Sequence, residues 1–137
     1  MGNIDLAYFA GFFDADGCIS LSKSRQEDCK QGYKFRLTIE VCQKARSVLH
    51  DFQENWGGGI YPGHRADRWY LYGDKAARFL QDILPYLRLK AREARLAIKL
   101  QRAKLAWRKR RTGRTDVECQ QEGEYHSLMI DLKAMRN

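Results

Sequence analysis

The chain has 137 residues, enough for one domain with a modest core, and its 44% hydrophobic and 31% charged residues exclude a disordered protein. Lys and Arg outnumber Asp and Glu by 25 to 17, a net charge of +8 that favours an anionic partner, nucleic acid first and a membrane surface second. No apolar stretch approaches the roughly 18 residues of a transmembrane helix, and the N-terminus lacks a signal-peptide pattern. We therefore expect an intracellular protein, cytoplasmic, nucleoid-associated or organellar, that does not enter a membrane.

The first predicted element is an apolar helix that runs to about Asp14, within the stretch Phe9-Ala10-Gly11-Phe12-Phe13-Asp14-Ala15-Asp16-Gly17. Asn3 or Asp5 can cap its start. Ala7 and Gly11 lie four residues apart on one helical face, with Ala10 beside them. This side of the helix is therefore nearly flat, and a second helix backbone can approach it closely.

Two carboxylates, Asp14 and Asp16, stand at the C-terminal end of this helix, where the negative end of the helix dipole disfavours them. Gly17 can take the left-handed conformation that commonly ends a helix. A cation must offset the cost of the two acids. A divalent metal is the obvious candidate, because carboxylate and backbone carbonyl oxygens suit Mg²⁺ or Ca²⁺.

Two predicted hairpins follow, and a helix comes after each of them. The predicted elements are strands over 18–24 and 34–42, a helix from 44 to 56 stopped by Gly57-Gly58-Gly59, strands over 60–65 and 68–72, and a helix over 74–84 that Pro85 ends. The order αββαββα predicts an α+β fold, an antiparallel sheet with helices packed on one face.

The other face of this sheet is expected to be polar, because each strand alternates apolar and polar residues. It can be an ordinary solvated surface, but its mixture of cations, tyrosines, hydroxyls and amides also suits the reading of base edges and phosphates. The candidate DNA-binding residues on this face and its flanks are Ser20, Ser22, Ser24, Gln26, Lys34, Arg36, Thr38, Glu40, Cys42, Lys44, His64, Arg68, Tyr70 and Tyr72.

The C-terminal third is strongly basic. Between Arg88 and Arg114 there are twelve Lys or Arg residues and a single acid, Glu93, on a predicted helix. Such a run is usually a solvated helix face, but this density favours contact with the phosphates of a polyanion. A polar loop over 112–123 and a last helix over 124–135 complete a single domain over 1–137, whose core spans about 4–110.

The four cysteines, at 18, 29, 42 and 119, form no C-x-x-C pair, and the three histidines are not placed to complete a zinc site. We expect four free thiols in a reducing compartment and no structural zinc.

The stretch over residues 9–17 resembles the motif of the LAGLIDADG homing endonucleases, with Phe9, Phe12 and Phe13 in place of Leu, Leu and Ile. The single copy resembles the small group I intron-encoded members. That resemblance implies a homodimer that cuts a near-palindromic double-stranded DNA target under a saddle-shaped sheet. It also implies a dimer interface at Ala7, Ala10, Gly11 and Asp14.

The resemblance implies three catalytic residues. Asp16 corresponds to the metal-binding acid, assisted by the backbone carbonyl of Ala15, with Mg²⁺ as the cofactor and Ca²⁺ expected to support binding without cleavage. Gln43 and Lys90 match the supporting glutamine and lysine, which can position a water and offset phosphate charge. Ser47 fills the place where family members often carry an arginine, so a phosphate contact by the neighbouring Arg46 is not implied.

Two other interpretations stay open. One is a catalytically inactive relative that acts as a DNA-binding regulator or an intron RNA maturase. The other is a small basic protein-interaction domain. The joint presence of Asp16, Gln43 and Lys90 favours the magnesium-dependent endonuclease, since a pure binder needs no acid beside a phosphate.

Overall fold

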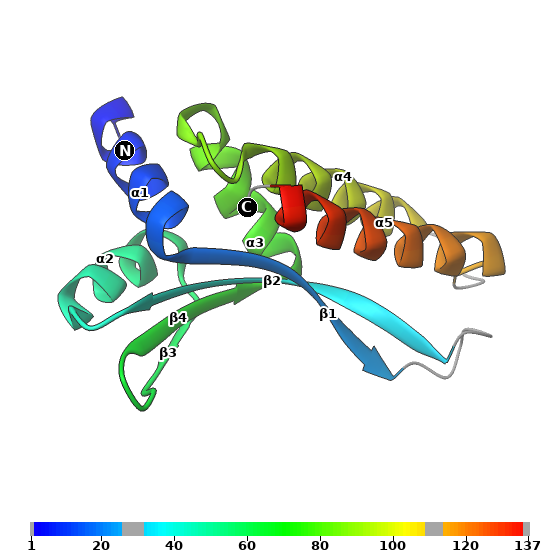
Figure 1. Ribbon diagram of the computed structural model, residues 1–137, viewed down its shortest axis with the longest axis horizontal. Coiled ribbons are helices and arrows are strands. Elements are labelled where there is room, and N and C mark those ends of the chain that lie inside the picture. Colours follow the sequence, from blue (N-terminus) through cyan, green and yellow to red (C-terminus); the bar gives the residue numbers. More distant parts are fainter. Residues whose placement is uncertain (1, 26–31, 109–113, 136–137) are drawn as a thin grey trace.

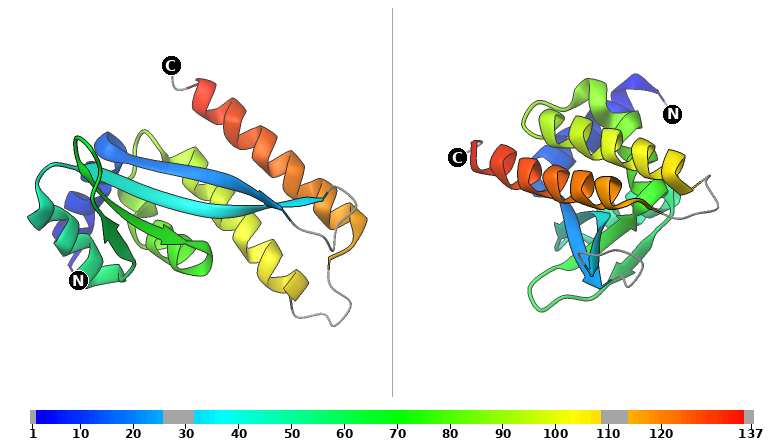
Figure 2. Two further views of the ribbon diagram at one scale, coloured as in Figure 1. Left: turned by 90° about the horizontal axis from the view of Figure 1, so that it is seen from below. Right: turned by 90° about the vertical axis from the view of Figure 1, so that its right-hand side faces the viewer.

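A computed structural model of the chain describes residues 2–25, 32–108 and 114–135. Its elements are α1 (Asn3–Asp16), β1 (Gly17–Arg25), β2 (Tyr33–Gln43), α2 (Arg46–Trp56), β3 (Gly59–Tyr61), β4 (Asp67–Tyr72), α3 (Gly73–Ile83), the 3-10 turn η1 (Leu84–Tyr86), α4 (Ala91–Arg108) and α5 (Asp116–Met135). The four strands form one antiparallel sheet in the order β1-β2-β4-β3. The helices lie on one side of this sheet, as Figure 1 and the view from below in Figure 2 show. The predicted α+β class and element order are confirmed.

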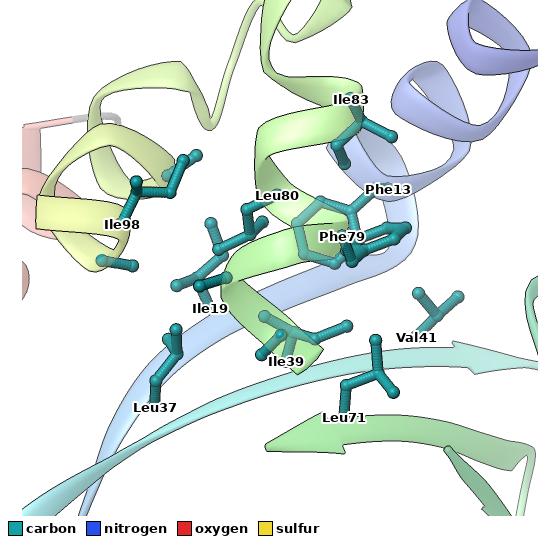
Figure 3. Packing of buried hydrophobic residues seen from close by; sticks show 14 of the residues in the cluster. Phe13, Ile19, Leu37, Ile39, Val41, Leu71, Phe79, Leu80, Ile83 and Ile98 are labelled. Atoms are coloured by element: carbon teal, nitrogen blue, oxygen red, sulfur yellow. The ribbon is translucent and has the colours of Figure 1, made fainter. Parts of the chain in front are cut away.

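The core lies between the sheet and the helices and follows the predicted strand alternation. The apolar positions of β1, β2 and β4 are all buried, namely Ile19, Leu21, Phe35, Leu37, Ile39, Val41, Trp69 and Leu71. Phe79, Leu80 and Ile83 of α3 come down onto this face (Figure 3). Each fully buried side chain of this size contributes roughly 1.5–3 kcal/mol of transfer free energy. The polar positions of the same strands therefore point away from the helices.

An aromatic cluster holds α1 and α2 against the sheet. The ring centroid of Phe52 lies 4.8 Å from those of Phe9 and Trp69. Trp56 stands nearly perpendicular to Phe9 at 5.0 Å and to Phe79 at 4.7 Å. Edge-to-face pairs of this kind are favourable beyond their buried area. They fix the direction of α1, and with it the position of the two carboxylates at its end.

Four predicted boundaries are corrected. The residue that caps α1 is Gly2, with no side-chain cap, so neither Asn3 nor Asp5 serves. The helix runs to Asp16, and Gly17 is extended, with φ −90° and ψ 164°, because β1 begins there and pairs with Val41. Glycine is required for a different reason from the predicted one, since a Cβ at Gly17 would collide with the Phe13 ring.

The third corrected boundary is the end of β3, which lies at Tyr61 and not near residue 65. Proline follows directly at position 62 and removes a backbone donor, which ends the ladder.

The last helix begins eight residues earlier than predicted, at Asp116. A capping box starts it: the Thr115 Oγ1 accepts a hydrogen bond from the Glu118 N–H at 3.2 Å, and Glu118 Oε1 accepts one from the Thr115 N–H at 2.8 Å. This Thr-x-x-Glu pattern was visible in the sequence. The predicted loop over 112–123 is therefore wrong from residue 116 onward.

Glu122 anchors α5 to the rest of the domain. Its buried carboxylate pairs with Lys104 of α4 at 3.7 Å and with Arg114, and it accepts a hydrogen bond from the backbone N–H of Phe35 in β2. Burial lowers the pKa of Lys104, while Glu122 opposes that shift. One acid thus joins α5, α4 and the start of β2.

The expectation of four free thiols is wrong at Cys119, which is buried and disulfide-bonded. Cys18 and Cys42 are free, and Cys29 lies outside the described residues. In the part of the chain that the structure describes, no helix is long and apolar enough to cross a membrane.

Candidate active site and nucleic-acid interface

The first of the two carboxylates at the end of α1 bonds within its own chain. Asp14 Oδ2 accepts the backbone N–H of Arg88 at 2.8 Å, and Oδ1 accepts that of Lys90 at 3.0 Å. The Nζ of Lys90, a residue only 5% exposed, donates to the Asp14 carbonyl at 2.6 Å. Lys90 therefore places its amine at the C-terminal end of α1, where the helix dipole favours a positive charge.

The second carboxylate, Asp16, is exposed and faces solvent beside the end of β2. Gln43 Nε2 donates to Asp16 Oδ2 at 3.0 Å, while Gln43 Oε1 accepts the Ala45 N–H at 3.1 Å. The second bond fixes which end of the amide faces Asp16. The structure thus brings two of the predicted catalytic residues into direct contact, and Lys90 joins them through Asp14, two residues along the helix.

The donor set at this point suits a hard divalent cation. The exposed Asp16 carboxylate and the carbonyl of exposed Ala15 are oxygen ligands of the kind that Mg²⁺ and Ca²⁺ prefer. Within residues 2–25, 32–108 and 114–135, however, no group of three or more His, Cys, Asp or Glu side chains gathers. One chain therefore offers two oxygen ligands, which are part of a coordination shell.

The predicted polar face lies next to this site, on the side of the sheet that the helices leave open (Figure 2). The ladder places Ser20 beside Thr38 and Thr38 beside Tyr72, and it places Ser22 beside Arg36. The guanidinium of Arg36 stacks over the Tyr72 ring at 3.8 Å. This cation–π contact holds the planar fork of Arg36 in one orientation.

Thr38 was predicted to contact DNA, but it is only 5% exposed. Its hydroxyl bonds to that of Ser22 at 3.1 Å. It supports its neighbours on the face and is not available for a base contact.

Glu40, Arg68 and Tyr61 form a second preorganised group on the same face. Arg68 Nη1 lies 2.9 Å from Glu40 Oε2, and the Tyr61 hydroxyl donates to Glu40 Oε1 at 3.3 Å. The hydrogen bond to Glu40 raises the pKa of Arg68, and burial together with Glu40 raises the pKa of Tyr61. Tyr61 was not among the predicted site residues; it is the cross-strand partner of Arg68, a pairing that the sequence did not indicate.

The remaining candidates are placed as follows. Ser24, Lys34, Cys42 and Tyr70 lie on the polar face of the strands, Lys44 is exposed just beyond β2, and His64 is exposed in the connection between β3 and β4. Gln26 lies outside the described residues. Arg46, which the family pattern left without a role, pairs with Asp67 at 3.4 Å.

The outward face of α1 differs in part from the prediction. Ala7 and Gly11 are exposed, and a Cβ added at Gly11 would meet nothing within 4 Å. Ala10 is fully enclosed by its own chain, so its assignment to a dimer interface is wrong. Ile4 and Tyr8, 87% and 52% exposed, complete the stripe instead. Their spacing from Ala7 and Gly11 follows the helical period, which was the available signal.

Asp14 is the other residue predicted at that interface. Its carboxylate accepts hydrogen bonds from the backbone of residues 88 and 90, so contact with a partner stays a prediction.

At the far side of the site, Lys133 of α5 places its Nζ 3.7 Å from Cys18 Sγ, one residue beyond Gly17. The basic end of α5 therefore reaches the start of β1.

These observations define a class of protein. It is an α+β domain that carries an exposed acid at the end of a helix, beside the polar face of an antiparallel sheet. The chain belongs to the LAGLIDADG endonuclease family, whose model matches residues 9–111. It is similar to the DNA endonuclease I-CvuI of Chlorella vulgaris, 30% identical over 102 residues, which are 71% of this chain and 63% of that protein. The DNA endonuclease I-CreI of Chlamydomonas reinhardtii is 29% identical over 99 residues, 69% of this chain and 61% of that one.

Among solved structures, I-CvuI in complex with its target in the presence of Ca superposes with a TM-score of 0.79 at 26% identity, over 94% of this chain and 82% of that one. A second I-CvuI complex, with the I-CreI target and Mg and with the DNA not cleaved, gives a TM-score of 0.66 at 30% identity, over 72% and 66%. The chain spans under two thirds of the length of the two curated relatives.

Proposed function

We propose that this protein is a site-specific DNA endonuclease that cuts both strands of a long, near-palindromic target as a homodimer, by metal-dependent phosphodiester hydrolysis. The observation that carries the proposal is the contact between Asp16 and Gln43, at the edge of a polar sheet face and away from the core. Family membership and the DNA-bound structures of the relatives support it.

The homodimer follows from the single motif. Cutting two antiparallel strands requires two equivalent sites, and a two-fold axis generates them from one site per chain. The exposed stripe of Ile4, Ala7, Tyr8 and Gly11 supplies a surface that two α1 helices can share. Pairing there brings the two Asp16 carboxylates together near the axis and sets the two sheets side by side.

Mg²⁺ is the proposed cofactor, and when bound it activates water and stabilises the leaving oxygen of the phosphodiester. Asp16 and the Ala15 carbonyl would hold it. Gln43 keeps the Asp16 carboxylate oriented through its hydrogen bond and presents its amide to a water. Lys90 positions the last turn of α1 and places a positive charge behind it. Ca²⁺ is expected to support binding without cleavage.

The polar sheet face is proposed to lie in the major groove. The guanidinium of Arg36, held over the Tyr72 ring, presents two donors in a fixed orientation that suits the two acceptors of guanine. Glu40 can keep its bond to Arg68 and at the same time accept a hydrogen bond from the amino group of cytosine. We propose that Ser20, Ser22, Ser24 and Tyr70 add hydroxyls to this face, and that Lys34, Lys44 and His64 contact phosphates.

Cleavage of a supercoiled plasmid library with randomised sites tests the proposal. Three reactions are run, with Mg²⁺, with Ca²⁺ and with EDTA. Discrete double-strand cuts are expected in Mg²⁺ alone, at sites with two-fold symmetry that sequencing of the linear products reads out. If the protein binds the plasmid but does not cut it in any of the three reactions, the endonuclease proposal is contradicted. That result would favour a DNA-binding relative without activity.

A further inference from the structure

The single acid in the basic run over residues 88–114 is buried. Only 1% of Glu93 is exposed. Two other acids of the described residues are also buried, and each has an evident structural role: Glu118 belongs to the capping box of α5, and Glu122 pairs with two cations. Removing a carboxylate from water is costly unless its charge is compensated. The burial of Glu93 therefore requires a partner of opposite charge or strong hydrogen-bond donors.

The place of Glu93 in α4 shows that it is not an ordinary capping acid. The Ala94 N–H donates to the Lys90 carbonyl at 2.9 Å, so Lys90 is the N-cap residue and Glu93 is the third residue of the helix. An acid at this position commonly accepts the backbone N–H of the cap residue, as Glu118 does in α5. In α4 that N–H, of Lys90, donates to Asp14 Oδ1 at 3.0 Å instead. The carboxylate of Glu93 therefore serves a different donor.

The side chain of Lys90 is the buried cation of the same turn. Lys90 is 5% exposed, and no other Lys or Arg within residues 2–25, 32–108 and 114–135 is equally buried. Its Nζ donates to the Asp14 carbonyl at 2.6 Å. An ammonium group carries three donors, and a carbonyl oxygen does not neutralise its charge. Because residues three apart share one face of a helix, Glu93 is the acid placed to act as its counter-ion.

The dipoles of two helices act on these charges in opposite senses. The end of α1 favours a positive charge, whereas the start of α4 favours a negative charge and disfavours a positive one. Lys90 lies at both helix ends, and Glu93 lies in the first turn of α4. With Glu93 neutral, both burial and the α4 dipole would oppose the charge on Lys90. The ammonium would then turn to solvent or lose its proton, and either response weakens its hold on the last turn of α1.

We propose that Glu93 is a positioning residue for DNA cleavage, which holds the Lys90 ammonium against the end of α1 and thereby keeps the Ala15 carbonyl and the Asp16 carboxylate in place. Glu93 acts through Lys90 and touches neither the metal nor the DNA. The inference rests on the proposed endonuclease function. It gives the first turn of α4 a part in the reaction that is separate from the basic surface of that helix.

The first test compares Glu93→Gln with Glu118→Gln in the full chain. The control makes the same change at the same position of another helix, in a residue that is also buried, at 7% exposure. Single-turnover cleavage is measured in Mg²⁺, and binding of the same labelled duplex is measured in Ca²⁺. Glu93→Gln should cut about tenfold more slowly and keep its Kd within about twofold, because the change displaces catalytic groups and removes no DNA contact. Glu93→Asp keeps the charge and should cut faster than Glu93→Gln. The control should change both quantities less than about twofold.

A double-mutant cycle with Lys90→Met tests whether Glu93 acts through Lys90. In that background Glu93→Gln should slow cleavage no further. Urea unfolding gives a second measurement that needs neither metal nor DNA. Glu93→Gln alone should lower the midpoint by about 1.5 M, because it leaves a buried cation without its counter-ion. In the Lys90→Met background the same change should raise the midpoint, because it removes a buried acid that has lost its cation.

Three results would each overturn the inference. They are cleavage at the wild-type rate by folded Glu93→Gln, equal losses of cleavage in Glu93→Gln and Glu118→Gln, and effects of Glu93→Gln that are the same with and without Lys90. A wild-type chain that never cuts would overturn the proposed function instead. The urea measurements would still decide the pairing in that case, since an equal fall of the midpoint in both backgrounds would contradict it.

Discussion

Replacing each of the two carboxylates that end α1 by alanine should affect the stability of the fold very differently. Asp14→Ala removes the acceptor of two backbone N–H groups, those of Arg88 and Lys90. Hydrogen bonds to a charged acceptor contribute about 1.5–3 kcal/mol each, and the lower figure fits a partly exposed site. The loss is then about 3 kcal/mol, reduced by about 0.5 kcal/mol because a negative charge leaves a helix C-terminus. A net destabilisation of about 2.5 kcal/mol is expected.

Asp16→Ala is the matched control, since Asp16 is exposed and its hydrogen bond to Gln43 is also exposed. Its free energy of unfolding should change by no more than about 0.5 kcal/mol. For a domain of this size, about 4 °C of Tm corresponds to 1 kcal/mol, so Asp14→Ala should melt about 10 °C below the wild type. Thermal unfolding followed by circular dichroism at one fixed protein concentration measures both, because the Tm of an oligomer depends on concentration. Melting of the two variants within 3 °C of each other would refute the division of roles.

Three further predictions concern other parts of the molecule. Gly11→Leu should convert the proposed dimer to a monomer, as measured by light scattering at micromolar concentration. The fold should be kept, because the position has open space in the single chain and leucine favours a helix. A dimer of unchanged mass would contradict the two-fold model. Glu122→Gln should cost about 3 kcal/mol of unfolding free energy in urea, because it removes the buried charge that pairs with the partly buried Lys104 and Arg114, whereas exposed Glu124→Gln should cost under about 0.5 kcal/mol. The pKa of Asp74 is lowered, first by the Gln101 amide and then by Arg108, so its contribution is complete above pH 3.8 and is lost as the pH falls below that value. Asp74→Asn should therefore be less stable than the wild type by about 0.5 kcal/mol at neutral pH, a small figure because half of the side chain is exposed, and the gap should close in acid melts.

The strands of the sheet could be predicted because the residue pattern that specifies each strand lies within the strand itself. Phe35, Leu37, Ile39 and Val41 alternate with polar residues, and burial on one face follows from that period alone. The start of α5 was equally local, since Thr115 and Glu118 form a capping box, but the polar composition of residues 116–123 concealed the helix.

Long-range partners could not be predicted from spacing. Asp14 bonds to residues 74 and 76 positions away, and no pattern near the motif indicates that its carboxylate turns inward while that of Asp16 stays exposed. Ala10 looked equivalent to Ala7 and Gly11 on a helical wheel, yet the aromatic cluster that contains Phe9 rotates Ala10 into the core. The family resemblance placed Asp16 and Gln43 in one site, but it did not predict their hydrogen bond, which forms because the pairing of β1 with β2 brings the two residues together.

The most direct test of the account compares Asp16→Asn with the wild type on a target recovered from the plasmid library. Cleavage is followed in Mg²⁺ and binding is followed in Ca²⁺ on the same labelled duplex. The variant is expected to cut neither strand and to bind with an affinity within about threefold of the wild type, because the change removes a proposed metal ligand and no base contact. Cutting at the wild-type rate would contradict the assignment of Asp16. If the variant lost both binding and cutting, Asp16 would act in DNA recognition. That result would contradict the proposal that Asp16 serves catalysis while the sheet face binds DNA.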